Sequence, residues 1–257
     1  MADPSRSELG DFLRSRRDRL TPGVVGLPGG RRRRTVGLRR EEVAELAGIG
    51  VDWYIRLEQG RAVSPSITTV DALARALRLS NAEHAHLRAL AHSAGRRPFV
   101  RETVPATIVG MVESLNQPAY VTGRRWDILA WNDAADEIFA FSRLAEEDRN
   151  TLICVLTNPN TRRLFGVSWA DEAERMVAEF RATHDLWAGD PAFLSLLDRL
   201  RRDCPEFGPW WEAHDIRRGG AGQKHLNHPG KGLLRFAYAT FQANDDPALK
   251  LAIYTPV

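Results

Sequence analysis

The sequence predicts a multi-domain protein: an all-α domain of five short helices, followed by an α+β domain built on an antiparallel sheet. Two observations carry this fold class. Before residue 98, apolar residues recur at helical spacing in short blocks. After it, strand-like stretches stand at both ends of a helical region. The intervening segment HSAGRRPFVRETVPATIV has no helical period until Ile108. We therefore assign 1–97 to the first domain, 98–107 to a linker and 108–257 to the second.

The first domain should contain five helices, each bounded by a stop or a cap. The first ends at Thr21-Pro22, and the last opens with a capping box running from Ser80 to Glu83. Those between them span Arg39 to Ala47, Val51 to about Glu58, and Ile67 to Leu77. The residues expected to face the core are Leu9, Phe12, Leu13 and Leu20, then Val43, Leu46 and Ala47, then Ile67, Val70, Ala74 and Leu77.

The second and third helices have the spacing of a helix-turn-helix. A small residue at Ala44 lets the third helix approach, Gly48 permits the tight turn, and Tyr54 with Leu57 anchors the third helix inward. The second helix of such a motif enters the DNA major groove. The pattern therefore favours double-stranded DNA as a partner.

Candidate DNA-binding residues follow from which side chains are left to face outward. An outward Trp53 or Ile55 suits thymine methyl groups and sugars, although Trp53 could instead pack against the first helix. Asp52 could accept from a cytosine amino group or serve the helix N-terminus. Arg39 and Arg40 should touch phosphates. The candidates on and after the third helix are Val51, Asp52, Trp53, Ile55, Arg56 and Arg61.

Charge is distributed unevenly between the two domains. Residues 1–97 hold 18 arginines and no lysine against 11 acidic residues, whereas 98–257 hold 18 basic and 22 acidic residues. The basic half indicates an acidic partner there. Arginine forks suit phosphate oxygens, but genome composition could also favour arginine, since the chain has only three lysines.

Four consecutive arginines stand in the long loop between the first two helices. The loop contains VVGLPGGRRRRTVG. A phosphate-binding loop is excluded because G-x-x-x-x-G-K-[ST] is absent and no strand precedes it. A solvated charge run remains as an alternative. We favour an arm that neutralises the DNA backbone or enters a minor groove, formed by Arg31, Arg32, Arg33 and Arg34.

The second domain should begin and end with strands. AYVTG and WDILAWN are typical of a hairpin, and NDAADEIFAF of a following helix. GLLRFAYATF alternates like a strand, and LKLAIYTP predicts a last one. Helices are predicted between these ends at Glu146 to Leu156, Trp169 to Trp187, Ala192 to Arg202 and about Pro209 to His214. We expect the terminal strands to join one antiparallel sheet.

This domain holds six of the seven tryptophans, and a small aromatic-rich domain can enclose an apolar pocket. Each aromatic residue taken alone could equally be plain core. His214 could hold a carboxylate or carbonyl group, or merely orient the turn at Asp215. The candidate ligand-binding residues are Tyr120, Trp126, Trp131, Phe139, Phe165, Trp211, His214 and Tyr238.

Enzymatic, metal and membrane functions find no support in the sequence. G-x-S-x-G, H-E-x-x-H and nucleotide-binding motifs are absent. His225 and His228 have a ligand-like gap, but no Cys or carboxylate cluster completes a site, so neither metal nor cofactor is expected. No apolar run approaches the ~20 residues of a membrane span. Lacking a secretory signal and paired Cys spacing, the chain should be cytoplasmic, with Cys154 and Cys204 reduced.

Together these motifs resemble known families. LRREEVAELAG, RLEQG and PSITTVDALARALRLS resemble the Cro and lambda-repressor type of helix-turn-helix regulator, with Gly50 and Tyr54 departing from its usual residues. The whole chain, through AYVTGRRWDILAWN, EEDRNTLICVLTNP and PEFGPWWEAHDIR, resembles XRE-family regulators with an MmyB-like domain. This resemblance implies a lambda-repressor-like first domain and a PAS-like second domain, for which a fatty-acid-like or other apolar ligand has been proposed.

The sequence therefore predicts a DNA-binding transcriptional regulator that is not an enzyme. One recognition helix contacts only a few base pairs, so a homodimer is expected. The second domain should sense an apolar small molecule, dimerise, or both. The alternative is a ligand-free platform for protein interaction.

Overall fold

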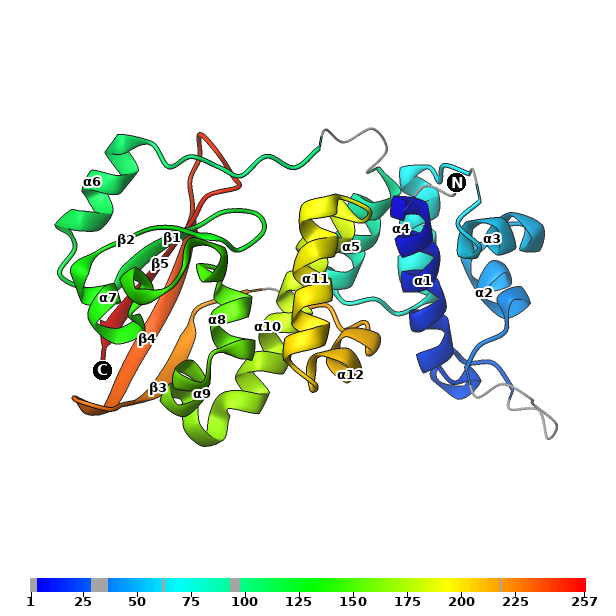
Figure 1. The fold of residues 1–257 in the computed structure, drawn as a ribbon. Helices are drawn as coiled ribbons and strands as arrows, with labels where there is room; N and C mark the ends of the chain where they lie inside the picture. Colours follow the sequence, from blue (N-terminus) through cyan, green and yellow to red (C-terminus); the bar gives the residue numbers. More distant parts are fainter. Residues whose placement is uncertain (1–3, 29–36, 62, 93–97, 218) are drawn as a thin grey trace. The chain divides into compact units, whose positions relative to one another are not determined.

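The computed structural model describes residues 4–28, 37–61, 63–92, 98–217 and 219–257 (Figure 1). The chain divides into two compact units. A helical unit comprises residues 1–98 together with 184–191, and an α+β unit comprises 99–183 and 192–257. The short segment 184–191 thus belongs to the helical unit although it follows a long helix of the other.

In its described residues, the helical unit contains the five predicted helices and two short 3-10 helices, one of which, η5 (Asp185–Trp187), lies in the segment 184–191. The elements before residue 98 are α1 (Pro4–Arg19), η1 (Pro22–Val25), α2 (Arg40–Ala47), α3 (Val51–Glu58), α4 (Ile67–Ala76) and α5 (Asn81–Ala91). The capping box at α5 is formed as expected, since the Ser80 hydroxyl accepts from Glu83 N and the Glu83 carboxylate accepts from Ser80 N. Ser66 caps α4, its hydroxyl accepting from Thr69 N.

The core of the helical unit follows the predicted faces with three exceptions, of which Leu20 is half-buried. Buried side chains from all five helices include Leu9, Phe12, Leu13, Val43, Tyr54, Leu57, Val70, Leu73 and Leu87. Leu46 and Ile67, which the apolar period placed inward, are 36% and 58% exposed. Ile67 is the first residue of α4 and Leu46 lies near the end of α2, where a helical period fixes the facing least well.

Two glycines allow backbones of the helical unit to approach closely. A Cβ at Gly10 in α1 would lie 2.4 Å from the Glu58 carbonyl oxygen at the end of α3. A Cβ at Gly37 would lie 2.5 Å from the Cα of Asp18. Both contacts are with main chain, which cannot rotate away, so α1 packs against α3 only because residue 10 has no side chain.

The α+β unit is built on one five-stranded antiparallel sheet of order β2-β1-β5-β4-β3 (Figure 1). The predicted hairpin and terminal strands are confirmed, and the last strand pairs with both β1 and β4. The edge strand β3 was not predicted from the sequence. The strands are β1 (Ala119–Thr122), β2 (Ile128–Trp131), β3 (Gly222–His228), β4 (Gly232–Gln242) and β5 (Lys250–Pro256).

Among the described residues of this unit, one helix precedes the first strand, and the others fill the chain between the two groups of strands. They are α6 (Ala106–Ser114), α7 (Asp133–Phe139), α8 (Thr151–Thr157), α9 (Pro159–Phe165), α10 (Trp169–His184), α11 (Pro191–Asp203) and α12 (Phe207–Glu212), with 3-10 turns η2 (Phe141–Arg143), η3 (Glu146–Asp148), η4 (Gly166–Ser168) and η5 (Asp185–Trp187). The predicted inward face of α10 is buried: Trp169, Ala173, Met176, Val177 and Phe180.

The helix predicted from Glu146 to Leu156 is interrupted. Its first part is η3, and α8 starts only after Asn150. The Asn150 side chain accepts from Leu152 N and donates to the Arg125 carbonyl oxygen at 2.7 Å. A buried asparagine that caps a helix and binds a neighbouring loop holds extended backbone, so the helix cannot run through it.

Candidate functional site

The helix-turn-helix is formed by α2 and α3 with a tight turn between them. Gly48 has φ 65°, and its N–H bonds the Glu45 carbonyl at 3.0 Å. Ile49 N donates to the Ala44 carbonyl at 2.9 Å, and this bond completes the cap in which Gly48 adopts the left-handed conformation. Gly50 precedes α3 and offers no side-chain cap. The turn therefore depends on the backbone freedom of Gly48.

The α3 helix divides sharply into an inner and an outer face. Tyr54, Leu57 and Glu58 are buried, as predicted for the first two. Burial raises the pKa of the Tyr54 hydroxyl well above its usual range. The exposed residues are Val51, Asp52 and Arg56, and the half-buried ones are Trp53 and Ile55. The five α3 residues predicted to contact DNA thus occupy the outer face or its edges.

A buried carboxylate, which the sequence analysis did not single out, holds α3 in place. Glu58 receives two hydrogen bonds from Arg17 of α1, at 2.8 and 3.1 Å, and one from Arg40 of α2 at 2.9 Å. Burial alone would raise the pKa of Glu58, but the hydrogen bonds and charges of both arginines outweigh it and lower that pKa. One carboxylate thereby links α1 to the two helices of the motif.

The other arginines predicted to contact DNA differ in their exposure and in their protein partners. Arg39 is exposed at the start of α2, and Arg61 is exposed just after α3. Arg40 is half-exposed and is held by Glu58, so its guanidinium has a protein partner beside the surface. The arginine run of residues 31–34 lies outside the described residues.

The α+β unit contains a cavity of about 130 Å³ between α10 and one face of the sheet. This is close to the ~150 Å³ of a cavity that holds one benzene molecule. Its lining mixes aromatic, apolar and charged side chains with two glycines: Tyr120, Thr122, Trp126, Thr151, Arg175, Met176, Glu179, Gly219, Gly220, Lys224, Tyr238, Thr240, Lys250, Ala252 and Tyr254.

Three tyrosines from three strands form one wall of the cavity. Tyr254 of β5 stacks on Tyr120 at 6.0 Å and on Tyr238 at 5.8 Å between ring centres. The hydroxyls of Tyr120 and Tyr254 lie 3.2 Å apart. Burial raises the pKa of both groups above the ordinary value, so both remain neutral at physiological pH.

A buried lysine faces this tyrosine wall. The Lys224 ammonium lies 4.6 Å from the ring centre of Tyr238 and 5.4 Å from that of Phe165, and it pairs with Glu172 of α10. Arg175 also binds Glu172, at 2.6 Å. Burial would raise the pKa of Glu172, but Lys224 and Arg175 outweigh it and lower that pKa. This carboxylate is therefore charged and pairs with the lysine.

A second carboxylate at the cavity, that of Glu179, has its pKa shifted in the opposite direction. Glu179 pairs with Arg175 one helical turn away. Burial is the largest influence on Glu179 and raises its pKa despite that pairing. Among the described residues here, Arg175, Lys224 and Lys250 face only two acidic groups, so the cavity has an excess of positive charge.

Three of the eight predicted ligand-binding residues line this cavity: Tyr120, Trp126 and Tyr238. Trp126 adopts φ 66°, a left-handed conformation that strains a non-glycine residue. Its carbonyl accepts from Thr151 N at 3.0 Å. That bond helps fix the conformation that brings Trp126 to the cavity.

The other predicted ligand-binding residues lie behind or away from the lining. Phe139 packs against Tyr120, and Phe165 lies beside Lys224. Trp131 contacts the Phe141 ring and is absent from the cavity lining. Also outside the lining are Trp211, buried against Phe207, and His214, which follows α12 with φ 53°.

The charged side chains that line the cavity were not predicted from the sequence. Arg175, Glu179 and Lys224 were not singled out, since charge on a helix or an edge strand usually faces solvent. The one available signal was the alternation in KHLNH, which places Lys224 on the same face as Leu226. The same alternation puts His225 and His228 on opposite faces of β3.

Cys154 and Cys204 are both free and buried. Burial raises the pKa of the Cys154 thiol to about 12. Across the described residues, no helix has both the length and the apolar character needed to cross a membrane.

Comparison with known proteins identifies both units. Residues 104–257 match the sequence model of the MmyB-like transcription regulator ligand binding domain, which covers more than half of the chain. Residues 8–87 match the model of a helix-turn-helix domain. None of the curated proteins compared with the chain matches it.

Proposed function

The chain belongs to the family of transcription regulators with an MmyB-like ligand-binding domain, and we propose that it binds a specific DNA sequence under the control of a small molecule. The observation that carries the DNA-binding half is the division of α3. Its inner face is anchored by Tyr54, Leu57 and Glu58, which leaves a free outer face at the turn. That is the arrangement of a recognition helix in the major groove.

We assign the DNA contacts to the outer face of α3 and to arginines around it. Val51 and Ile55 suit thymine methyl groups, and Arg56 suits a base edge or a phosphate. Arg39 and Arg61 flank the helix and suit phosphates. Arg40 contributes through its hold on Glu58 as well as through any phosphate contact.

The cavity of the α+β unit is the proposed sensor site. Its ligand would be an apolar, fatty-acid-like molecule with one acidic end. The aromatic wall and Met176 would contact the apolar part, and the positive excess around Lys224 would receive the acid. A cavity of about 130 Å³ holds the acidic end and a few carbons, so a longer chain requires the cavity to open.

The regulator would act as a homodimer on a two-fold operator. Each recognition helix reads one half-site, and two helices double the contact. The ligand controls DNA binding only if it binds the DNA-competent and incompetent states with different free energies.

The primary experiment is fluorescence anisotropy of the full chain on its own upstream DNA, across a salt series and against random competitor. Tight, competitor-resistant binding with a steep salt slope supports the proposed specific regulator. Binding that random DNA removes completely would refute sequence specificity under those conditions.

The ligand half is tested with dodecanoate, its methyl ester and benzoate. We expect dodecanoate to quench the Trp126 fluorescence and to change DNA affinity, and the uncharged ester to do neither. Trp126→Phe identifies the reporting fluorophore. If no acid binds, and mass spectrometry of the purified protein finds no co-purified small molecule, the protein-interaction platform replaces the sensor.

A further inference from the structure

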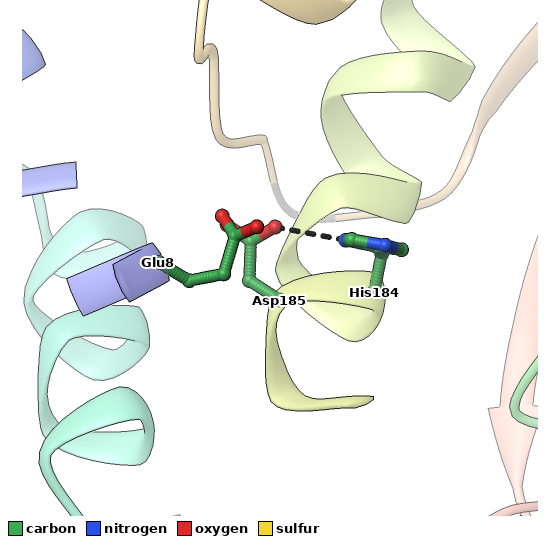
Figure 2. Close-up of side chains that lie close together, drawn as sticks. All are labelled: Glu8, His184 and Asp185. Atoms are coloured by element: carbon green, nitrogen blue, oxygen red, sulfur yellow. Dashed lines mark hydrogen bonds and ion pairs between the residues drawn. The ribbon is translucent and has the colours of Figure 1, made fainter. Parts of the chain in front are cut away.

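A separate group of titratable side chains lies in the helical unit. It consists of Glu8 from α1, His184 at the end of α10 and Asp185 at the start of η5 (Figure 2). One ligand-type atom of each residue lies within 4.8 Å of those of the other two. Both His184 and Asp185 belong to the segment 184–191 of this unit.

The cluster is largely shielded from water. Asp185 is 1% exposed and His184 is 2% exposed, while Glu8 is half-buried. A carboxylate buried this deeply requires strong compensating contacts. Figure 2 shows the carboxyl groups of Glu8 and Asp185 close together, with an edge of the His184 ring turned toward them.

Asp185 is oriented by an imidazole on each of its oxygens. Its Oδ1 lies 3.1 Å from Nδ1 of His184, and its Oδ2 lies 3.1 Å from Nε2 of His86 on α5. The His86 ring is itself fixed edge-on against Phe12, with centres 5.1 Å apart. Outer side chains of this kind orient the carboxylates that bind metal ions.

The donor set of the cluster is one imidazole nitrogen and two carboxylates. Imidazole favours first-row transition metals, whereas Ca²⁺ and Mg²⁺ prefer all-oxygen sites. Zinc bonds of about 2.0–2.2 Å in a tetrahedron place ligand atoms roughly 3.3 Å apart. Each ligand atom of the cluster would need to move by at most about 1 Å to reach that spacing.

We propose that Glu8, His184 and Asp185 bind a divalent first-row transition metal ion, Zn²⁺ fitting best, with His86 as an outer positioning residue. Three protein ligands leave a fourth position for water. The bound ion would fasten α1 to the segment 184–191. This site could not be predicted from the sequence, because its ligands come from distant parts of the chain and no local spacing relates them.

The test is zinc binding by the full-length protein after dialysis against a chelator. We expect calorimetry to find one Zn²⁺ per chain with an affinity in the micromolar range or tighter, and thermal unfolding to shift upward with zinc. Cobalt should give a visible spectrum of nitrogen and oxygen ligands, without the thiolate bands that Cys154 or Cys204 would produce.

Variants assign the binding to this cluster. Glu8→Gln removes a half-buried ligand, and it should weaken zinc binding at least tenfold and abolish the thermal shift. His86→Gln should weaken binding by about 10–100-fold, as loss of an outer-shell partner does. The matched control Glu45→Gln, on the exposed face of α2, and the double variant His225→Asn/His228→Asn should bind as the parent does.

Circular dichroism of the zinc-free variants confirms that each is folded before the comparison. The proposal is overturned if the parent takes up no stoichiometric zinc. It is equally overturned if folded Glu8→Gln binds zinc unchanged, or if the His225/His228 variant is the one that loses it. In those cases the cluster is a hydrogen-bonded carboxylate–imidazole network only.

Discussion

Replacing Glu58 by glutamine should destabilise the helical unit more than any exposed substitution in it. The glutamine keeps the shape of the side chain but removes the negative charge to which Arg17 and Arg40 are hydrogen-bonded. The Glu58 side chain is fully buried, and that of Arg17 is 10% exposed. Breaking a buried pair by removing one partner costs about 3–5 kcal/mol, because the other charge stays buried.

The contribution of Arg40 to this loss is small. Its side chain is 39% exposed, and solvent screening limits such pairs to about 0–1 kcal/mol. The glutamine amide also retains one acceptor for Arg17, so we expect about 3 kcal/mol in total. That is a large part of the roughly 5–15 kcal/mol by which a domain is stable.

Urea unfolding of the full chain measures the effect, and hydrogen exchange by mass spectrometry of α1 to α3 assigns it to the helical unit. A loss of about 3 kcal/mol lowers the urea midpoint by roughly 1–3 M. Glu45→Gln is the matched control, since its carboxylate is exposed on α2 and its loss should leave the midpoint unchanged. A Glu58→Gln midpoint equal to that of the control would refute the structural role of this carboxylate.

The pH dependence gives an independent check with a defined sign. The folded pKa of Glu58 is lowered, so its stabilising contribution is complete above the ordinary glutamate pKa of about 4.3. It is lost as pH falls through the lower folded value. The stability difference between parent and Glu58→Gln should therefore be constant at neutral pH and shrink in acid; a difference that grew on acidification would contradict the cited pKa shift.

Three further predictions concern packing, DNA and ligand. Gly10→Ala should lower the thermal midpoint, because its Cβ would meet the Glu58 carbonyl. The control Gly110→Ala has open space around its Cβ in α6 and should raise the midpoint by restricting the unfolded chain. Equal shifts in the two variants would exclude the backbone contact at Gly10. Arg56→Ala should reduce the slope of log affinity against log salt by about 0.9 if the guanidinium neutralises one phosphate, which anisotropy titrations measure. Lys224→Met should abolish the preference for dodecanoate over its methyl ester in fluorescence titrations; an unchanged preference would place the acid elsewhere.

The helical unit was largely predictable because its signals are local. Gly48 ends α2 and a Ser80 cap opens α5, and each acts within one helical turn. The inward orientation of Tyr54 and Leu57 follows from the helical spacing of residues in α3 alone. Glu58 was not predictable, since a glutamate on a short helix normally faces water and its arginine partners come from two other helices.

The α+β unit was predictable in its strands and in the inner face of α10, where the apolar period is clear. The helix stop at Asn150 and the unusual backbone of Trp126 could not be predicted from the sequence. Asn150 stops a helix through a bond to the carbonyl of Arg125, a residue from the preceding hairpin. Trp126 turns toward the cavity in a left-handed conformation that nothing in its sequence neighbourhood indicates.

The chemistry of the cavity is a property of strand register. Alternation along β4 says that Tyr238 and Phe236 share a face, but only the pairing of Tyr238 with Tyr254 sets two tyrosine rings side by side. Tyr120 joins them because β1 pairs with the opposite edge of β5, with Tyr120 facing Ala252. A slip of one residue would turn either tyrosine to the far side of the sheet and leave Lys224 facing an altered wall. The proposed sensor site therefore depends on long-range strand pairing, whereas the proposed recognition helix depends on a turn and one buried carboxylate.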